Sequence, residues 1–229
     1  MNVLVTGATG FIGRTLSSTL VERGYAVKAG VRSADSRLCL PALNTVAVGN
    51  MGARADWSEA LRGVECVIHC AARADAMDDN KTDRLDDYRA VNVTGTKCLA
   101  EQAAALGVRR LVFLSSIKVN GEQTALGEPF SITDVPAPRD AYGVSKLEAE
   151  QELWAVSDRT GLEVVVVRPP LVYGPGVRGN LLRLLRWVAC GVPLPLGAVR
   201  NQRSLLGLSN LLDLLLLCVE HPAAAGQTF

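Results

Sequence analysis

A tyrosine and a lysine lie four residues apart in the segment RDAYGVSK, residues 139–146. In a helix, side chains at positions i and i+4 share one face, so Tyr142 and Lys146 would be neighbours one turn apart. The ordinary pKa of a phenol is about 10, which makes it a poor base near neutral pH. A nearby ammonium charge stabilises the phenolate and lowers that pKa. The pair therefore predicts general acid–base chemistry, with Tyr142 as the group that moves a proton.

Three glycines, Gly7, Gly10 and Gly13, form a second candidate site in VLVTGATGFIGRTL. They follow a predicted strand and open a predicted helix, the context in which such glycines bind a dinucleotide. Gly7 permits a tight turn, Gly10 lets the backbone approach a pyrophosphate, and Gly13 lets the helix pack on the sheet. The free N–H groups and positive dipole end of that helix would face the phosphates.

The composition argues against several other kinds of site. A formal net charge of +1 offers no basic surface for nucleic acid or for a membrane. The two histidines, His69 and His221, are far apart in sequence, so we expect no metal site and no Ser-His-Asp hydrolase. His69 lies in an apolar run and is interpreted as a core histidine. The six cysteines are scattered without a C-x-x-C motif, and we expect reduced thiols.

The sequence predicts neither a signal peptide nor a membrane span. The opening MNVLVTG has no signal-peptide features, and the most apolar stretch, LLDLLLLCVE, is too short to span a bilayer. We therefore expect a cytoplasmic protein without a membrane partner. The final GQTF resembles the start of another strand, and we expect the chain to be a fragment of a longer protein.

The elements that must position these residues alternate along the chain. The predicted strands are residues 2–7, 25–32, 44–50, 64–72, 109–116 and 162–170. The predicted helices are residues 11–24, 56–63, 82–107, 142–160, 180–190 and 208–220. Apolar strands separated by helices predict a parallel sheet covered on both faces, the doubly wound α/β (Rossmann) class. We expect a dinucleotide-binding domain at 1–170 and, at 171–229, a small truncated substrate lobe with elements that return to the Rossmann core.

The motifs GATGFIG, HCAA, NVTGT, FLSS, YGVSK and RPPLVYGPG occur in an order and at spacings that resemble the extended short-chain dehydrogenase/reductase family. More narrowly, they resemble its NAD-dependent epimerase/dehydratase branch, which handles nucleotide sugars. Within that branch they are similar to the reductases of UDP-4-keto-6-deoxy-N-acetylhexosamines and to the UDP-galactose 4-epimerases. The resemblance implies that Tyr142 is the catalytic acid/base and that Lys146 also holds the nicotinamide ribose. It implies that Ser116 hydrogen-bonds the sugar oxygen and that Asn92 braces the site.

The same resemblance implies a wider set of contacts. The implied cofactor-binding residues are Gly7, Gly10, Phe11, Ile12, Gly13, Arg32, Asn50, Met51, Cys70, Ala71, Ala72, Asn92, Tyr142, Lys146, Pro169 and Val172. The implied substrate-binding residues are Ser116, Lys118, Asn180, Leu181 and Arg203, with Arg203 on the diphosphate. One position departs from the epimerase pattern, because Leu171 stands where an Asn usually contacts the substrate. The resemblance also implies a homodimer formed through helices 82–107 and 142–160.

The type of reaction depends on two further segments. The sugar dehydratases carry Thr-Asp-Glu where this chain has Ser116, Ile117 and Lys118, which argues against dehydration. The second strand ends in Val31 and Arg32; an acid there suits the ribose hydroxyl of NAD, whereas an arginine suits the 2′-phosphate of NADP. We therefore favour NADP(H), with NAD(H) possible, and expect 4-keto reduction of a UDP-sugar. The alternatives are a UDP-hexose or UDP-N-acetylhexosamine 4-epimerase and a non-catalytic NADP-binding redox sensor.

Overall fold

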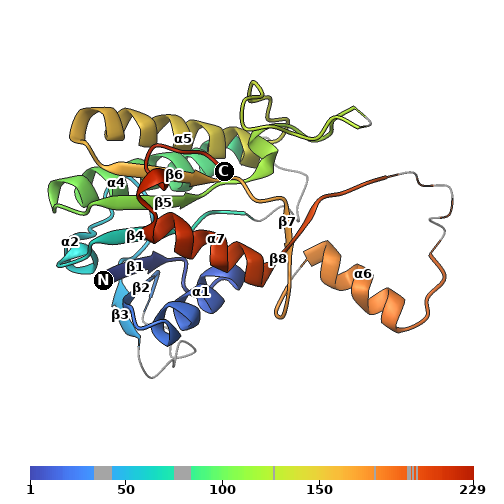
Figure 1. The fold of residues 1–229 in the computed structure, drawn as a ribbon, viewed down its shortest axis with the longest axis horizontal. Coiled ribbons are helices and arrows are strands. Elements are labelled where there is room, and N and C mark those ends of the chain that lie inside the picture. The colour runs from blue at the N-terminus through green and yellow to red at the C-terminus, as the bar shows by residue number, and fades with distance from the viewer. Residues whose placement is uncertain are drawn as a thin grey trace.

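Six parallel strands form the central sheet in the computed structural model of the chain (Figure 1). The structure describes residues 1–33, 43–74, 84–125, 127–177, 179–194, 197, 199 and 201–229. The strands are β1 (Asn2–Thr6), β2 (Ala26–Val31), β3 (Asn44–Ala47), β4 (Cys66–His69), β5 (Arg110–Leu114) and β6 (Glu163–Val167). Their order across the sheet is β3-β2-β1-β4-β5-β6, the doubly wound order. The predicted fold class is therefore confirmed, although each of these six strands is shorter than predicted.

The order of the strands reverses between β1 and β4. Thr6, the last residue of β1, pairs with Gly30 of β2 on one side and with His69 of β4 on the other. In open parallel sheets, ligands bind beyond the carboxyl ends of the strands at such a point. The glycine turn after β1 and the segment after His69 therefore leave the sheet side by side, at the edge where a ligand is expected.

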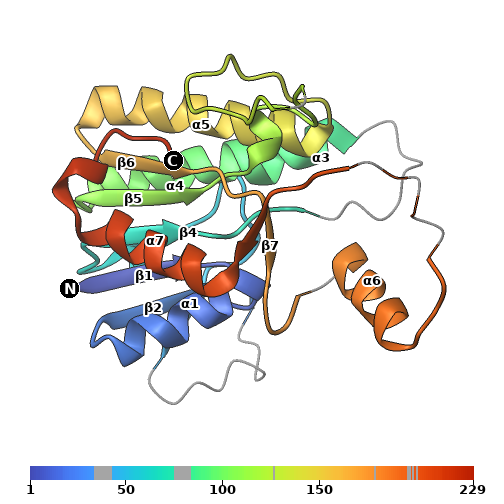
Figure 2. The ribbon, with the colours of Figure 1, turned by 45° about the vertical axis from the view of Figure 1, so that its right-hand side comes forward.

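Helices cover both faces of the sheet (Figure 2). On one face, α1 (Phe11–Glu22) and α7 (Leu208–Glu220) share a core cluster with the strands. On the other face, α2 (Ser58–Leu61), α4 (Gly95–Ala105) and α5 (Ala141–Thr160) form a second cluster. Apolar residues of α7 recur at helical spacing, so one stripe of that helix is buried while Asp213 stays outside.

The long helix predicted at 82–107 is interrupted. Residues 82 and 83 lie outside the described part; from there the chain forms α3 (Arg84–Tyr88), a π-helical segment (Arg89–Thr94) and then α4. Periodicity does not reveal such a segment, because it is short and both of its flanks keep ordinary helical spacing. The π-helical segment carries Asn92, whose side chain points into the protein and is buried.

The described residues between β6 and α7 form two short strands and a helix that lie at one end of the sheet. β7 (Leu171–Tyr173) pairs in parallel with β8 (Leu205–Gly207), a small sheet that the sequence did not predict. α6 (Gly179–Ala189) stands away from the body of the fold in both ribbon views (Figures 1 and 2). None of its described residues is buried, although it is strongly amphipathic.

The last residues of the chain lie along β6. Thr228 forms a parallel bridge with Val166 of β6, and the backbone N–H of Arg168 donates to the carbonyl oxygen of Phe229 at 2.7 Å. Short 3₁₀ turns occupy Ile117–Val119 and Pro222–Ala224. Within the described ranges, no helix is both long enough and apolar enough to cross a membrane.

Candidate active site

The glycine turn after β1 is closely packed. Gly7 has a positive φ of +68°, and a Cβ built on it would lie 2.7 Å from the backbone nitrogen of Ala71. A Cβ on Gly13 would lie 2.3 Å from the carbonyl oxygen of Gly7, which is closer than any real contact. That carbonyl also accepts a hydrogen bond from the backbone N–H of Gly10 at 2.9 Å. Gly7 and Gly13 are thus required by the packing of the turn itself.

Gly10 faces outward and directly precedes α1. It is exposed, and a Cβ there would meet only the Gly7 carbonyl oxygen, at 3.1 Å. The amino end of α1 has no side-chain cap and no acidic residue in its first turn. The first N–H groups of a helix lack intrahelical partners, and together with the helix dipole they attract an anion. Phe11 and Ile12 pack their side chains on the core below. The turn therefore fits a pyrophosphate.

Hydrogen bonds of Thr6 and of the buried His69 connect the segments that leave β1 and β4. The Thr6 hydroxyl accepts from the backbone N–H of Ala71 at 3.2 Å and lies 2.6 Å from Nδ1 of His69. The other ring nitrogen, Nε2, lies 3.0 Å from the hydroxyl of Thr96 on α4. The expectation of a core histidine is confirmed. Cys70, Ala71 and Ala72 follow directly, beside the glycine turn.

His69 should make the protein sensitive to acid. Burial, with the nearby Lys146 charge, lowers the pKa of His69 from 6.5 to about 3. The unfolded chain binds a proton below pH 6.5, whereas the folded chain resists it until about pH 3. Stability from this residue is complete above pH 6.5 and falls by about 1.4 kcal/mol per pH unit below it. We expect the wild type to lose stability faster than His69→Gln between pH 6.5 and pH 4, measured by urea unfolding.

His221→Gln, which removes an exposed imidazole, is the matched control for the effect of the substitution itself. Parallel curves for the wild type and His69→Gln would show that His69 carries no such linkage.

Asn92 joins the segment after β4 to α5. Its Oδ1 accepts from the backbone N–H of Arg73 at 2.8 Å, and its Nδ2 donates to the Arg73 carbonyl at 3.1 Å. Nδ2 also donates to the hydroxyl of Ser145 at 3.0 Å. The predicted bracing role agrees with this geometry. A π-helical turn is often found at functional sites, and here it directs the buried amide toward α5.

Tyr142 and Lys146 lie near the amino end of α5. The helix begins after Asp140, whose Oδ1 accepts from the backbone N–H of Gly143 at 2.6 Å and caps the first turn. Lys146 is buried, and its Nζ donates to the carbonyl oxygen of Leu114 at 2.8 Å. Nζ lies 6.0 Å from the centroid of the Tyr142 ring. The two side chains therefore share one face, as predicted.

The predicted lowering of the Tyr142 pKa is wrong for this arrangement. Burial raises the pKa of Tyr142 to about 12, and the negative charge of Asp140 adds to the shift. Burial likewise lowers the pKa of Lys146 to about 8, against the opposing effects of Cys70 and Glu150. Desolvation disfavours the charged form of both groups, and the ammonium is directed at the Leu114 carbonyl rather than at the phenol.

Ser116 and Lys118 follow β5 and pack against the start of α5. Ser116 is partly buried, and its hydroxyl accepts from the backbone N–H of Lys118 at 3.3 Å. The ammonium of Lys118 forms an ion pair with Asp140, the cap of α5. A Cβ on Gly143 would lie 2.9 Å from the Lys118 carbonyl oxygen, so this glycine lets the two segments meet. Lys118 thus lies beside the Tyr142 end of α5.

Other predicted cofactor residues lie around the same sheet edge. Arg32 is exposed directly after β2, and Asn50 is exposed in the segment after β3. The neighbouring Met51 is partly buried and packs near Gly95. Pro169, after β6, is buried and accepts a hydrogen bond from the backbone N–H of Ile117 at 3.0 Å. Val172, in β7, packs on the core cluster of α1 and α7.

The structure does not bring every predicted substrate residue to Tyr142. Asn180 and Leu181 are on α6, which stands apart from α5 in both ribbon views, and the Asn180 amide oxygen accepts from Arg183 at 2.5 Å. Arg203 is exposed in the segment before β8. These three residues remain predicted contacts.

The sequence reasoning missed a buried carboxylate behind Lys146. Glu150, one turn further along α5, pairs with Arg168 and accepts from the hydroxyl of Ser115. The i, i+4 spacing of Lys146 and Glu150 in YGVSKLEAE was the available signal.

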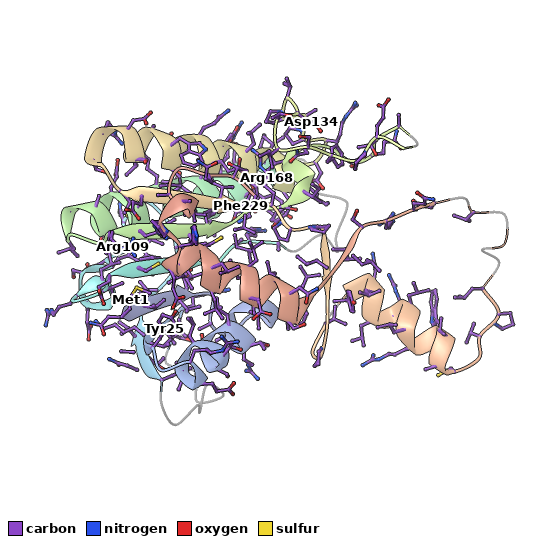
Figure 3. All side chains as sticks on the ribbon, viewed as in Figure 1. Met1, Tyr25, Arg109, Asp134, Arg168 and Phe229 are labelled. Carbon is purple, nitrogen blue, oxygen red and sulfur yellow. The ribbon has the colours of Figure 1, made fainter. Side chains whose placement is uncertain are left out.

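A cavity of about 440 Å³ lies at the other end of the sheet. It is lined by Met1, Arg23, Gly24, Tyr25, Arg109 and Glu220. Figure 3 shows Met1, Tyr25 and Arg109 at the end of the fold opposite to α6. This cavity is therefore separate from the glycine turn and from Tyr142.

Comparison with known proteins matches residues 3–229 to the family described as "NAD dependent epimerase/dehydratase family". The chain is 46% identical to a UDP-glucose 4-epimerase of Vibrio cholerae over 233 residues, covering all of this chain and 69% of that protein. It is 35% identical to a 2-alkyl-3-oxoalkanoate reductase of Stenotrophomonas maltophilia, covering 80% of this chain and 54% of that one. The solved structure of MoeE5 in complex with UDP-glucose and NAD is 30% identical, with a TM-score of 0.85 over all of this chain and 75% of that one.

Proposed function

The chain belongs to the NAD dependent epimerase/dehydratase family, and on this premise we propose that it interconverts the C4 epimers of a UDP-hexose through a 4-keto sugar. The observation that carries the proposal is the pair Tyr142 and Lys146 on one face of α5, beside the exit of β5 that bears Ser116. The identity to the Vibrio cholerae UDP-glucose 4-epimerase supports the choice of reaction.

The residues present fit an NAD cofactor. The uncapped amino end of α1 and the outward Gly10 would hold the pyrophosphate, and Lys146 would hold the nicotinamide ribose. Cys70, Ala71 and Ala72, beside the glycine turn, would line the cofactor. When bound, the nicotinamide supplies a hydride acceptor and donor, and the protein supplies position and electrostatics.

Tyr142 would move the proton of the sugar C4 hydroxyl. With its pKa near 12 in this arrangement, the phenol is protonated at neutral pH and suited to donate to the keto oxygen. In the opposite direction a phenolate must form, and the Lys146 ammonium, charged below about pH 8, is the nearby cation that would stabilise it. The Ser116 hydroxyl would hold the same sugar oxygen.

Residues 171–207 would form part of the substrate lobe, while α7 and the returning end of the chain belong to the Rossmann core. α7 is anchored there by the buried Arg110, whose Nη1 donates to the carbonyl oxygens of Cys218, Val219 and His221 at 2.8, 3.0 and 2.9 Å. Asn180, Leu181 and Arg203 would contact the nucleotide from the lobe, and Lys118 the sugar or diphosphate. A homodimer through the helices at 82–107 and 142–160 is the expected assembly.

The function is tested by incubating the protein with NAD and UDP-glucose and following the sugar signals by NMR. We expect UDP-galactose to appear until the two epimers reach equilibrium, without net consumption of NAD. A parallel incubation with UDP-N-acetylglucosamine tests the acetamido sugar. Absence of both conversions, with NADPH-dependent reduction of a UDP-4-keto-6-deoxy sugar, would replace this proposal with the second candidate.

That second candidate is a 4-keto reductase of UDP-sugars that uses NADPH. The observation that favours it is Arg32, exposed directly after β2, preceded by the buried Val31. Val31 cannot accept the hydrogen bond of the ribose hydroxyl in NAD, whereas a guanidinium can hold a 2′-phosphate. The pair Tyr142 and Lys146 argues against a third possibility, a redox sensor without chemistry.

Arg32→Ala should discriminate between the two cofactors. A charge-assisted contact of this kind is worth about 1.5–3 kcal/mol, or about one to two decades in affinity. We expect the variant to lose that factor for NADP(H) and to keep its affinity for NAD(H), measured by calorimetric titration of each cofactor. Arg62→Ala, an exposed arginine on another loop, is the matched control. Equal binding of NAD(H) and NADP(H) by the wild type would remove the support for the reductase.

A further inference from the structure

A buried ion pair behind Lys146 has no role in the function proposed above. Arg168 donates from Nη2 to Oε2 of Glu150 at 2.5 Å and from Nε to Oε1 at 3.1 Å. The two side chains are only 10% and 2% exposed. Burying two charges is costly, and such pairs often contribute little net stability. Stability alone therefore does not account for this buried pair.

The ion pair joins α5 to the exits of two strands. The Ser115 hydroxyl, at the exit of β5, donates to Oε1 of Glu150, and the Ser115 backbone N–H donates to the carbonyl of Val167 at 2.7 Å. Nη1 of Arg168, at the exit of β6, donates to Oδ1 of Asn120 at 3.1 Å. Figure 3 labels Arg168 and Phe229, which are linked through their backbones near this point. The exits of β5 and β6 are thus fixed to one turn of α5.

The same turn of α5 holds Lys146. Lys146 precedes Glu150 by four residues, so both side chains leave the same face of the helix. Its ammonium donates to the Leu114 carbonyl, in the residue immediately before Ser115. Lys146 and Glu150 therefore bind adjacent residues of the same strand exit, and Ser116 follows directly.

Glu150 supplies the negative charge in the surroundings of Lys146. The groups that face the ammonium are His69 and Cys70 from β4 and its exit, Phe113 and the Leu114 carbonyl from β5, and Tyr142 and Glu150 from α5. Burial keeps His69 neutral, and it raises the pKa values of the Cys70 thiol and the Tyr142 phenol to about 12. Within this set, the carboxyl group is that of Glu150, which is ion-paired with Arg168 and opposes, together with Cys70, the desolvation of Lys146.

We propose that Glu150, held by Arg168, is a positioning residue that fixes the Lys146 ammonium and the Ser115–Ser116 strand exit beside Tyr142. The proposal rests on the proposed function in one respect only, the use of Lys146 and Ser116 in the reaction. The placement of Lys146 by Glu150 can be measured without any substrate.

Two variants separate positioning from stability. Glu150→Gln removes the charge but leaves Arg168 buried without its partner, which is strongly destabilising. The double variant Glu150→Gln/Arg168→Met removes both charges, and buried pairs replaced in this way often retain stability. Glu148→Gln is the control, because Glu148 lies on the same helix but pairs with Arg89 at 2.5 Å, away from Lys146.

The titration of Lys146 is the main measurement, followed by NMR of protein labelled with ¹³C at the lysine ε-carbon. The lysines are few, and Lys146→Met assigns the signal. We expect the double variant to keep a melting temperature near that of the wild type and to titrate Lys146 at a lower pH than the wild type, because one of the groups that oppose its desolvation is lost. In the Glu148→Gln variant, Lys146 should titrate as it does in the wild type. A double variant whose Lys146 titrates as in the wild type overturns the proposal.

A second readout applies once turnover is observed. The double variant should lower kcat more than it raises KM, and the alkaline fall of its pH–rate profile should move to lower pH. A protein that turns over no UDP-sugar contradicts the proposed function but leaves the Lys146 titration interpretable.

Discussion

Tyr142→Phe should reduce turnover of the UDP-sugar by about 10²–10⁴-fold, the usual contribution of a general acid–base group. The change removes only the phenol oxygen, so the ring keeps its edge contact with Tyr88, whose centroid lies 6.2 Å away. We therefore expect the variant to fold and to bind NAD nearly as well as the wild type. Initial rates at saturating substrate, with calorimetric titration of NAD, measure the two effects separately.

Tyr25→Phe is the matched control for the loss of a phenol oxygen. The hydroxyl of Tyr25 donates a hydrogen bond to Glu220. Tyr25 lies at the opposite end of the sheet (Figure 3), where no step of the reaction is expected. The Tyr25→Phe variant should turn over the UDP-sugar at the rate of the wild type. If Tyr142→Phe also keeps a near wild-type rate, Tyr142 is not the proton-transfer group.

Gly13→Ala should remove both cofactor binding and much of the stability of the fold. The added Cβ would lie 2.3 Å from the carbonyl oxygen of Gly7 and 2.8 Å from its carbon, both of them backbone atoms that cannot rotate away. Overpacking costs about 1–3 kcal/mol when the surroundings can adjust, and here the adjustment must move the turn that would hold the pyrophosphate. Urea unfolding and NAD titration measure the two losses.

Substitutions at two other glycines separate the effect on folding from the effect on NAD binding. Gly24 has a φ of +83° and open space around it, so Gly24→Ala should cost about 1 kcal/mol of stability and leave NAD binding unchanged. Gly10→Ala meets one atom at 3.1 Å and should weaken NAD binding more than folding. Wild-type stability in Gly13→Ala would show that the turn is less rigid than its packing indicates.

Local patterns in the sequence determined much of this protein. Apolar runs separated by helical periodicity predicted the parallel sheet, and the spacing of Gly7, Gly10 and Gly13 predicted the turn after β1, because both depend on backbone geometry. The neighbouring positions of Tyr142 and Lys146 followed from helical spacing alone. Family membership now supports NAD as the cofactor, whereas the preference for NADP(H) inferred from Arg32 remains a prediction.

The tertiary structure decided what depends on burial and on contacts distant in sequence. The sequence indicated a lowered Tyr142 pKa from its neighbour Lys146, but the folded protein raises it, because desolvation depends on surroundings that the helix alone does not reveal. The π-helical turn that directs Asn92 toward Arg73 and Ser145 is likewise hidden in a helical pattern. The pairing of Glu150 with Arg168, 18 residues away in sequence, exists only because α5 packs across the exits of β5 and β6. The types and the spacing of the side chains therefore determined which groups could react. The packing of the folded chain determined the protonation of these groups and the residues that hold them in place.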